Sequence, residues 1–234
     1  MSDDTLLQIY IARHGESWGN VHFAEGEEPE YKNEHERLDP ELTPLGVEQA
    51  ALLGERLSGL RFDAIFSSFL VRAIGTAHEV WTRQVKPAAE IEVLRDLVES
   101  GTPWDYAGYP VKTIKERFPE VKSVEFLGLD EEEWGRFERE EPHESRLERA
   151  RLCMNYFRSR FEKGENIFVA AHGGFNTYLT KAALGLTNEN DFGFCQENTG
   201  LTKIKYYVDG RVRLSYANDT SHLYEKMPGI TFTL

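Results

Sequence analysis

Five residues with side chains suited to acid–base and anion chemistry are spread along this sequence. They are Arg13, His14, Arg72, Glu99 and His172. An arginine offers a rigid fork of donors that matches phosphate oxygens, and two arginines could balance the charge of one dianion. A neutral imidazole can attack phosphorus when one ring nitrogen carries a proton and the other presents its lone pair. A nearby carboxyl group could protonate the leaving oxygen, so the set suffices for phosphoryl transfer without a metal ion.

Each histidine of this set lies where an apolar run changes abruptly to polar residues. The run over residues 7–12 leads into Arg13-His14-Gly15-Glu16-Ser17, and the run over residues 166–171 leads into His172-Gly173-Gly174. Such a change is typical of a buried strand that ends in a loop. Open α/β sheets bind their ligands in the crevice beyond the carboxyl ends of the strands. We therefore expect the two histidines at that edge of one sheet.

The remaining pattern alternates strands with helices. Further strands are predicted over residues 62–68, 90–97, 202–208 and 212–216, and helices over residues 43–60, 70–84, 145–161 and 175–184. Thr43 and Pro44 are typical of the start of a helix, and Asp209-Gly210 is a strong signal for a two-residue hairpin. The order predicts an α/β fold of three layers (αβα), with a mostly parallel central sheet and an antiparallel edge hairpin.

Two stretches lack a steady periodicity, and we interpret them as insertions in a single domain over residues 1–234. Residues 21–41 are acidic and predict a long loop. Residues 100–144 are charged and dotted with aromatic side chains, which predicts a cap-like insertion. This insertion could form a lid over the site, and the acidic run from Asp130 to Glu141 within it could disfavour highly charged anions near the mouth.

The composition indicates a globular protein. No apolar run approaches the roughly 18 residues that span a bilayer, and the first ten residues do not resemble a secretion signal, so we expect a cytoplasmic protein without a membrane partner. The formal net charge of −13 opposes binding to nucleic acid. Cys153 and Cys195 match no zinc or disulfide spacing, so reduced thiols, no metal and no other cofactor are expected. The oligomeric state stays open, with a homo-oligomer among the choices.

Several motifs follow one another along nearly the whole chain. They are Arg13-His14-Gly15-Glu16-Ser17 with Asn20, Leu42-Thr43-Pro44-Leu45-Gly46 with Gln49-Ala50, Ser67-Ser68 with Arg72-Ala73 and Thr76-Ala77, Glu99, Glu144-Ser145 with Arg149, His172-Gly173-Gly174, and Asn198-Thr199. In these motifs and their order the chain resembles the histidine phosphatase superfamily, also called the phosphoglycerate mutase-like family. It is similar to members of the phosphatase type. Gly75 departs from the usual pattern of the third motif. Linked motifs in one order are far more specific than a single short string.

The resemblance implies a metal-independent mechanism through a phosphohistidine. His14 would attack the phosphorus, and Glu99 would protonate the leaving group. Arg13, Arg72 and His172 would hold and neutralise the phosphoryl oxygens.

The resemblance also implies secondary contacts with the phosphate or the substrate. Ser17, Asn20 and the backbone of Gly173 would make them, and His222, in the segment NDTSHL, would have a supporting role only. The implied ligand is a small phosphorylated metabolite.

Three functions remain open on the sequence. A phosphatase passes the phosphoryl group to water, whereas a bisphosphoglycerate-dependent phosphoglycerate mutase must hold a doubly phosphorylated acid and needs extra basic residues. Residues 25–28 after the signature loop are mostly acidic, and no Arg-Arg pair occurs in residues 110–142, where Lys112, Lys115 and Arg117 remain as basic candidates. The sequence therefore favours a phosphatase for a small phosphorylated substrate, with the mutase as the alternative. A non-catalytic phospholigand-binding protein comes third, because no catalytic residue is missing.

Overall fold

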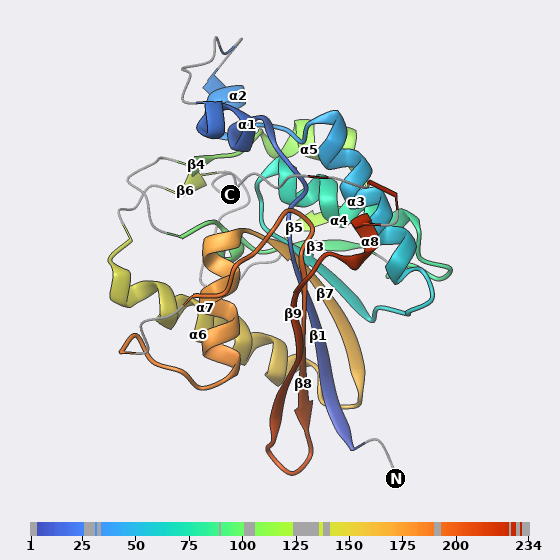
Figure 1. Cartoon of the computed structure of the whole chain (residues 1–234), viewed down its shortest axis with the longest axis vertical. Helices are drawn as coiled ribbons and strands as arrows, with labels where there is room; N and C mark the ends of the chain where they lie inside the picture. The colour runs from blue at the N-terminus through green and yellow to red at the C-terminus, as the bar shows by residue number, and fades with distance from the viewer. Residues whose placement is uncertain are drawn as a thin grey trace.

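The central element of the fold is a seven-stranded sheet in the order β5-β3-β2-β7-β1-β8-β9 (Figure 1). The computed structural model describes residues 4–25, 31, 34–88, 90–100, 106–123, 136–137, 141–189, 193–224, 226–227 and 230. The strands are β1 (Thr5–Arg13), β2 (Ala64–Ser67), β3 (Ile91–Val93), β5 (Val121–Ser123), β7 (Glu165–Ala171), β8 (Leu201–Tyr207) and β9 (Val212–Asp219). Within this sheet, as far as the structure describes it, the antiparallel pairs are β1–β8 and β8–β9, and the other neighbours are parallel. The predicted mostly parallel sheet with an antiparallel edge hairpin is therefore confirmed.

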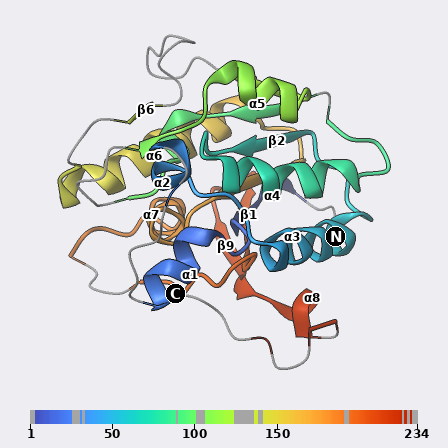
Figure 2. The ribbon, with the colours of Figure 1, turned by 90° about the horizontal axis from the view of Figure 1, so that it is seen from above.

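Helices cover both faces of this sheet (Figures 1 and 2). On one face lie α3 (Pro44–Leu57), α4 (Val71–Thr82) and α5 (Val111–Arg117), and on the other lie α6 (His143–Arg160) and α7 (Gly173–Ala183). The short α8 (Ser221–Tyr224) packs against α3. In Figure 1, β1 rises from the N-terminus towards the end where α1 (Trp18–Glu25) and α2 (Glu34–Leu38) lie. The three predicted layers are present, and the strand ends that carry the histidines point to one end of the molecule.

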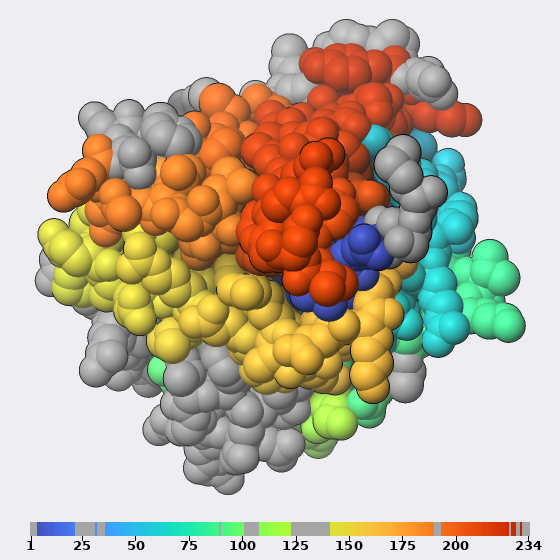
Figure 3. Space-filling view, turned by 90° about the horizontal axis from the view of Figure 1, so that it is seen from below, coloured from blue at the N-terminus to red at the C-terminus, as the bar shows by residue number. Residues whose placement is uncertain are grey.

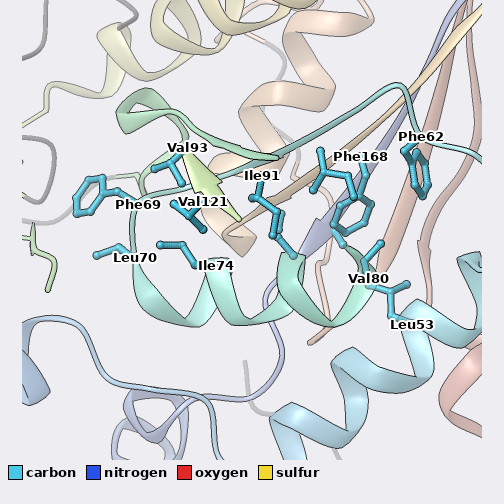
Figure 4. Packing of buried hydrophobic residues seen from close by; sticks show 14 of the residues in the cluster. Leu53, Phe62, Phe69, Leu70, Ile74, Val80, Ile91, Val93, Val121 and Phe168 are labelled. Atoms are coloured by element: carbon cyan, nitrogen blue, oxygen red, sulfur yellow. The ribbon is translucent and has the colours of Figure 1, made fainter. Parts of the chain in front are cut away.

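Strict alternation along the central strands divides the core into two halves. Side chains of β1 and β7 that face α3 and α4 are Tyr10, Ala12, Phe168 and Ala170, and those that face α6 and α7 are Ile9, Ile11, Ile167 and Val169. Figure 4 shows the first half, where Leu53 and Val80 from the helices approach Phe62 and Phe168. Fully burying each of the Val, Leu, Ile and Phe side chains among them stabilises the fold by roughly 1.5–3 kcal/mol.

The C-terminal hairpin closes one edge of the sheet. Asp209-Gly210 lies in its turn, as predicted, but the connection is longer than the predicted two residues, because β8 ends at Tyr207 and β9 begins at Val212. Gly210 has a φ of +83°, a conformation that glycine adopts at little cost. Seen from below (Figure 3), the hairpin lies beside the N-terminal segment in the middle of the face, between the region of α6 and β7 on one side and that of α3 on the other.

Three segments differ from the expectation. The strand predicted over residues 90–97 ends at Val93, where the chain leaves the sheet, and residues 95–97 form a 3₁₀ helix, η1 (Arg95–Leu97). The stretch expected as a loop over residues 21–41 contains most of α1 and all of α2, which carry no apolar stripe that sequence periodicity could reveal. The stretch expected as a cap-like insertion contributes α5 and the edge strand β5 to the main body. It also holds an antiparallel pair, β4 (Tyr106–Ala107) with β6 (Arg136–Phe137), whereas most of the acidic run 130–141 lies outside the described residues.

Among the described residues, no helix combines the length and the apolar character needed to cross a membrane.

Candidate active site

The loop that carries His14 is pressed against the first turn of α3. A Cβ atom on Gly15 would lie 2.3 Å from the carbonyl oxygen of Gly46, and one on Gly46 would lie 1.9 Å from that of Glu16, so a side chain fits at neither glycine. Thr43 caps α3 by accepting a hydrogen bond from the Gly46 amide at 3.0 Å, and it donates to Glu16 Oε1 at 2.8 Å. The motif at the start of α3 therefore positions the signature loop.

Two further side chains hold the backbone of this loop from other elements. Thr76 in α4 accepts a hydrogen bond from the Gly15 amide at 3.0 Å and donates to the carbonyl oxygen of Arg72 at 2.8 Å. Asn198 donates to the carbonyl oxygen of His14 at 3.1 Å. Because the backbone on both sides of the His14 side chain is anchored, the ring has little freedom to move.

The ring of His14 has one unprotonated nitrogen. Its Nδ1 lies 2.6 Å from the carbonyl oxygen of Gly15, which can only accept, so Nδ1 carries the proton. The Nε2 atom accepts a hydrogen bond from Nε of Arg72 at 3.3 Å. Burial, assisted by Arg72 and Arg13, lowers the pKa of His14 well below its ordinary value, so the imidazole is neutral at pH 7. A neutral ring with an unprotonated Nε2 is the form that attacks phosphorus.

The ring of His172 lies edge-on beside the ring of His14. His172 follows β7, the parallel neighbour of β1, and the centroids of the His14 and His172 rings are 5.2 Å apart. Its Nε2 lies 2.9 Å from Oγ of Ser68, whereas its buried Nδ1 has no hydrogen-bond partner among the residues that the structure describes. Burial, with the neighbouring Arg72, lowers the pKa of His172 well below its ordinary value.

Two guanidinium groups flank the histidines. Arg13, the last residue of β1, donates from Nη1 to the carbonyl oxygen of Gln196 at 2.8 Å, and Arg72 lies in the first turn of α4. Burial lowers the pKa of Arg13, an effect that the nearby Glu99 and Glu197 oppose. The arginines remain cationic at neutral pH, and because both are largely removed from water their attraction for an anion is strong.

Glu99 lies at the N-terminus of α7. Its Oε1 accepts hydrogen bonds from the amides of Ser100 at 2.6 Å and Phe175 at 2.8 Å, and its Oε2 accepts one from the amide of Gly174 at 3.1 Å. A Cβ atom on Gly174 would lie 2.7 Å from Glu99 Oε1, which explains the second glycine of this motif. Glu99 is also close enough to Arg13 to raise the pKa of its guanidinium group.

The three predicted secondary contacts lie around the same loop. Ser17 donates from Oγ to Oδ1 of Asn20 at 3.0 Å, and Asn198 donates to the same oxygen at 3.4 Å. The backbone amide of Asn20 donates to the carbonyl oxygen of Ser17 at 2.9 Å, whereas its side-chain nitrogen Nδ2 has no partner within the described residues and can serve a ligand. Gly173 opens α7, where helix geometry leaves its N–H without an intrahelical acceptor.

Asp39 is a site residue that the sequence did not reveal. Its carboxylate is fully buried, accepts the Val71 amide with both oxygens at 3.0 and 2.9 Å, and forms an ion pair with Arg72 at 3.3 Å. Asp39 belongs to the acidic stretch expected as a loop, and its partner lies 33 residues further along the chain. No local pattern signals such a contact.

The family model described as the histidine phosphatase superfamily (branch 1) matches residues 9–220. The chain belongs to the histidine phosphatase superfamily. The match starts within β1 and ends just before α8, so it includes every site residue described above.

Individual members of the superfamily that resemble this chain include mutases and phosphatases. The chain is 28% identical over 192 residues to a 2,3-bisphosphoglycerate-dependent phosphoglycerate mutase 1 of Arabidopsis thaliana, a match that covers 70% of this chain and 54% of the mutase. The chain therefore spans about half the length of that relative. It is 30% identical over 120 residues to phosphoserine phosphatase 1 of Hydrogenobacter thermophilus, covering 49% of this chain and 48% of that protein.

The fold matches a solved structure over almost its whole length. A crystal structure of phosphoserine phosphatase from Entamoeba histolytica in complex with 3-phosphoglyceric acid has a TM-score of 0.60 with this chain at 22% identity. The match covers 93% of this chain and 99% of the other. At this identity the likeness establishes the shared fold.

Proposed function

We propose that this protein is a phosphomonoesterase that hydrolyses a small phosphorylated metabolite through a phosphohistidine at His14. The observation that carries the proposal is the arrangement around Nε2 of His14. That atom is deprotonated and lies 3.3 Å from a guanidinium nitrogen of Arg72, and the ring of His172 lies 5.2 Å from the ring of His14 between their centroids. A nucleophile thus lies among groups that can hold the oxygens of one phosphoryl group.

The reaction proceeds in two transfers. In the first, Nε2 of His14 forms a bond to phosphorus while the ester oxygen–phosphorus bond breaks, and the leaving oxygen takes a proton from the carboxyl group of Glu99. In the second, a water oxygen attacks phosphorus, its proton passes to Glu99, and the nitrogen–phosphorus bond breaks. The products are an alcohol and inorganic phosphate, and the enzyme returns to its starting protonation state.

The charges around the site favour a monoester over a doubly phosphorylated acid. Each of the two guanidinium groups already has a carboxylate nearby, Asp39 beside Arg72 and Glu99 near Arg13. Arg117, a candidate basic contact on α5, is paired with Glu41 at 2.8 Å. This arrangement suits one dianion better than two phosphate groups and a carboxylate.

Phosphoenzyme trapping tests the proposal. Enzyme mixed with a ³²P-labelled monoester and quenched in denaturant should carry an acid-labile, alkali-stable label, and hydrolysis of p-nitrophenyl phosphate should be insensitive to a chelator. His14→Ala should lose both the label and turnover, whereas His143→Ala, at an exposed histidine at the start of α6, should retain both.

Three outcomes would contradict the proposal. Bound phosphate without turnover of any monoester would favour the phospholigand-binding protein. Activity that is lost with a chelator would contradict a metal-free site. Bisphosphoglycerate-dependent interconversion of phosphoglycerates, faster than hydrolysis in a parallel assay, would identify a mutase instead.

A further inference from the structure

Ser68 and His172 form a buried pair on adjacent strand ends. Ser68 follows β2 and His172 follows β7, and the Ser68 amide donates to the carbonyl oxygen of Ala170 at 3.0 Å. Both residues have no exposed surface. The contact between them is a hydrogen bond of 2.9 Å between Ser68 Oγ and His172 Nε2.

The direction of this hydrogen bond follows from the other partners of Ser68. The amide of Leu70 donates to Ser68 Oγ at 3.4 Å, so this oxygen already accepts one proton. Among the described residues, the Ser68 hydroxyl proton has one acceptor within reach, and that acceptor is Nε2 of His172. A buried hydroxyl that does not donate loses a hydrogen bond at a cost of about 1–3 kcal/mol. The hydroxyl therefore donates, and Nε2 of His172 accepts.

The protonation of the His172 ring is then determined. The environment keeps the ring neutral, because burial and the cationic Arg72 disfavour a second proton. A neutral imidazole carries one proton, and since Nε2 accepts from Ser68, that proton is on Nδ1. Nδ1 is buried and has no partner among the described residues, so its N–H is free for an anion that enters the site.

We propose that Ser68 is a positioning residue that fixes His172 as the Nδ1–H tautomer, so that Nδ1 donates to an oxygen of the transferring phosphoryl group. The donation from Nδ1 of His172 to a phosphoryl oxygen rests on the proposed function, whereas the assignment of the tautomer does not. The two histidines of the site are thereby held in complementary states. His14 has its Nδ1 proton bound to the Gly15 carbonyl and presents a bare Nε2, whereas His172 has its Nε2 bound to Ser68 and presents an N–H. Without this assignment, His172 could turn a lone pair towards the phosphoryl oxygens and repel them.

Nitrogen-15 NMR of the histidine side chains tests the tautomer directly. Two-bond correlations distinguish a protonated Nδ1 from a protonated Nε2, and the His172→Asn variant assigns the resonance by its absence. The unliganded wild-type protein should show His172 with Nδ1 protonated and Nε2 bare. A protonated Nε2 would overturn the proposal, whatever the enzymatic activity. Because no substrate is present, a failure of the proposed function would leave this result unchanged.

The Ser68→Ala variant tests the consequence, with Ser67→Ala as its matched control. Ser67 is equally buried on the same strand end, but its hydroxyl donates to the backbone carbonyl of Ser68 and does not contact His172. Ser68→Ala should give a mixture of His172 tautomers, a fall of about tenfold in kcat with p-nitrophenyl phosphate and weaker inhibition by vanadate. Ser67→Ala should retain the wild-type tautomer and stay within about twofold in kcat. An Nδ1–H tautomer with full turnover in Ser68→Ala would overturn the positioning role. Equal losses of kcat in Ser68→Ala and Ser67→Ala would also overturn it, because they would show that Ser68 contributes only to packing.

Discussion

Asp39 Oδ1 lies 3.3 Å from Nη1 of Arg72, with the carboxylate entirely removed from solvent. The same carboxylate accepts the amide of Val71 at the start of α4, so Asp39 ties the arginine and the helix that carries it to the segment before α3. Burial raises the pKa of Asp39 to about 7, although Arg72 and the Val71 amide both favour its charged form. The orientation of Arg72 towards His14 therefore depends on a residue outside the signature motifs.

Asp39→Asn should reduce kcat/KM about tenfold, because the amide retains an acceptor for Val71 but not the charge that holds Arg72. The ratio of wild-type to variant activity should be largest above pH 7. It should shrink below pH 7, where the wild-type carboxyl itself becomes protonated. Steady-state kinetics from pH 5 to 9 measures this ratio. Glu48→Gln, at an exposed position on α3, is the control and should show no such trend. A pH-independent ratio would contradict the ion-pair explanation.

The loss of kcat in Glu99→Gln should depend on the basicity of the leaving group. If Glu99 protonates the leaving oxygen, the variant should lose about a hundredfold or more in kcat with an alkyl phosphate, since general acid catalysis contributes roughly 10²–10⁴-fold. The loss should be below about tenfold with p-nitrophenyl phosphate, whose leaving group needs little protonation. Glu148→Gln, at an exposed position on α6, should change neither rate. Equal losses on both substrates would exclude Glu99 as the proton donor.

Arg149→Met should lower the free energy of unfolding by about 3–5 kcal/mol, because it leaves buried Glu141 without its cationic partner. Arg149 pairs with both oxygens of Glu141 at 2.7 and 2.8 Å and donates to the carbonyl oxygens of Asp96 and Val98 at 2.6 and 2.9 Å. Since Val98 precedes Glu99, turnover should also fall. Urea unfolding gives the stability. Arg151→Met, on the same helix with an exposed pair at 3.6 Å, should cost about 1 kcal/mol at most. Similar losses in the two variants would contradict the importance of the buried pair.

His222→Gln should make the protein less sensitive to acid. Burial, with the nearby Arg56, lowers the pKa of His222 to about 4, so the unfolded chain binds a proton near pH 6.5 that the folded protein does not. His222 therefore destabilises the fold as the pH falls from 6.5 towards 4. Gln can still donate to Thr199 Oγ1, which lies 3.0 Å from Nε2, but it does not titrate.

The loss of unfolding free energy between pH 7 and 4.5 should be smaller by about 2 kcal/mol in His222→Gln than in the wild type. Chemical denaturation at the two pH values gives this difference. The raised pKa of Asp39 acts in the opposite direction in both proteins and cancels in the comparison. Identical pH dependence in the two proteins would show that His222 does not carry this effect.

The sequence by itself determined the elements with a strong local signal. Alternation in β1 and β7, the Thr43-Pro44 helix start and the Asp209-Gly210 turn are properties of neighbouring residues, and each element appears where it was predicted. Four of the five candidate catalytic residues lie at a strand end or a helix start, whereas Glu99 follows the 3₁₀ helix η1 and was singled out only as the carboxyl group after the strand predicted over residues 90–97. Segments without an apolar period, such as α2 and α5, gave no comparable signal.

Only the tertiary structure decided how these residues act on one another. The partners that orient His14, Arg72 and His172 are Gly15, Asp39 and Ser68, and two of these three pairs join residues 33 and 104 positions apart. Which nitrogen of an imidazole carries the proton depends on the atoms that meet the ring in space. Burial, which sets the pKa values of these groups, likewise arises only when the two layers of helices close over the sheet.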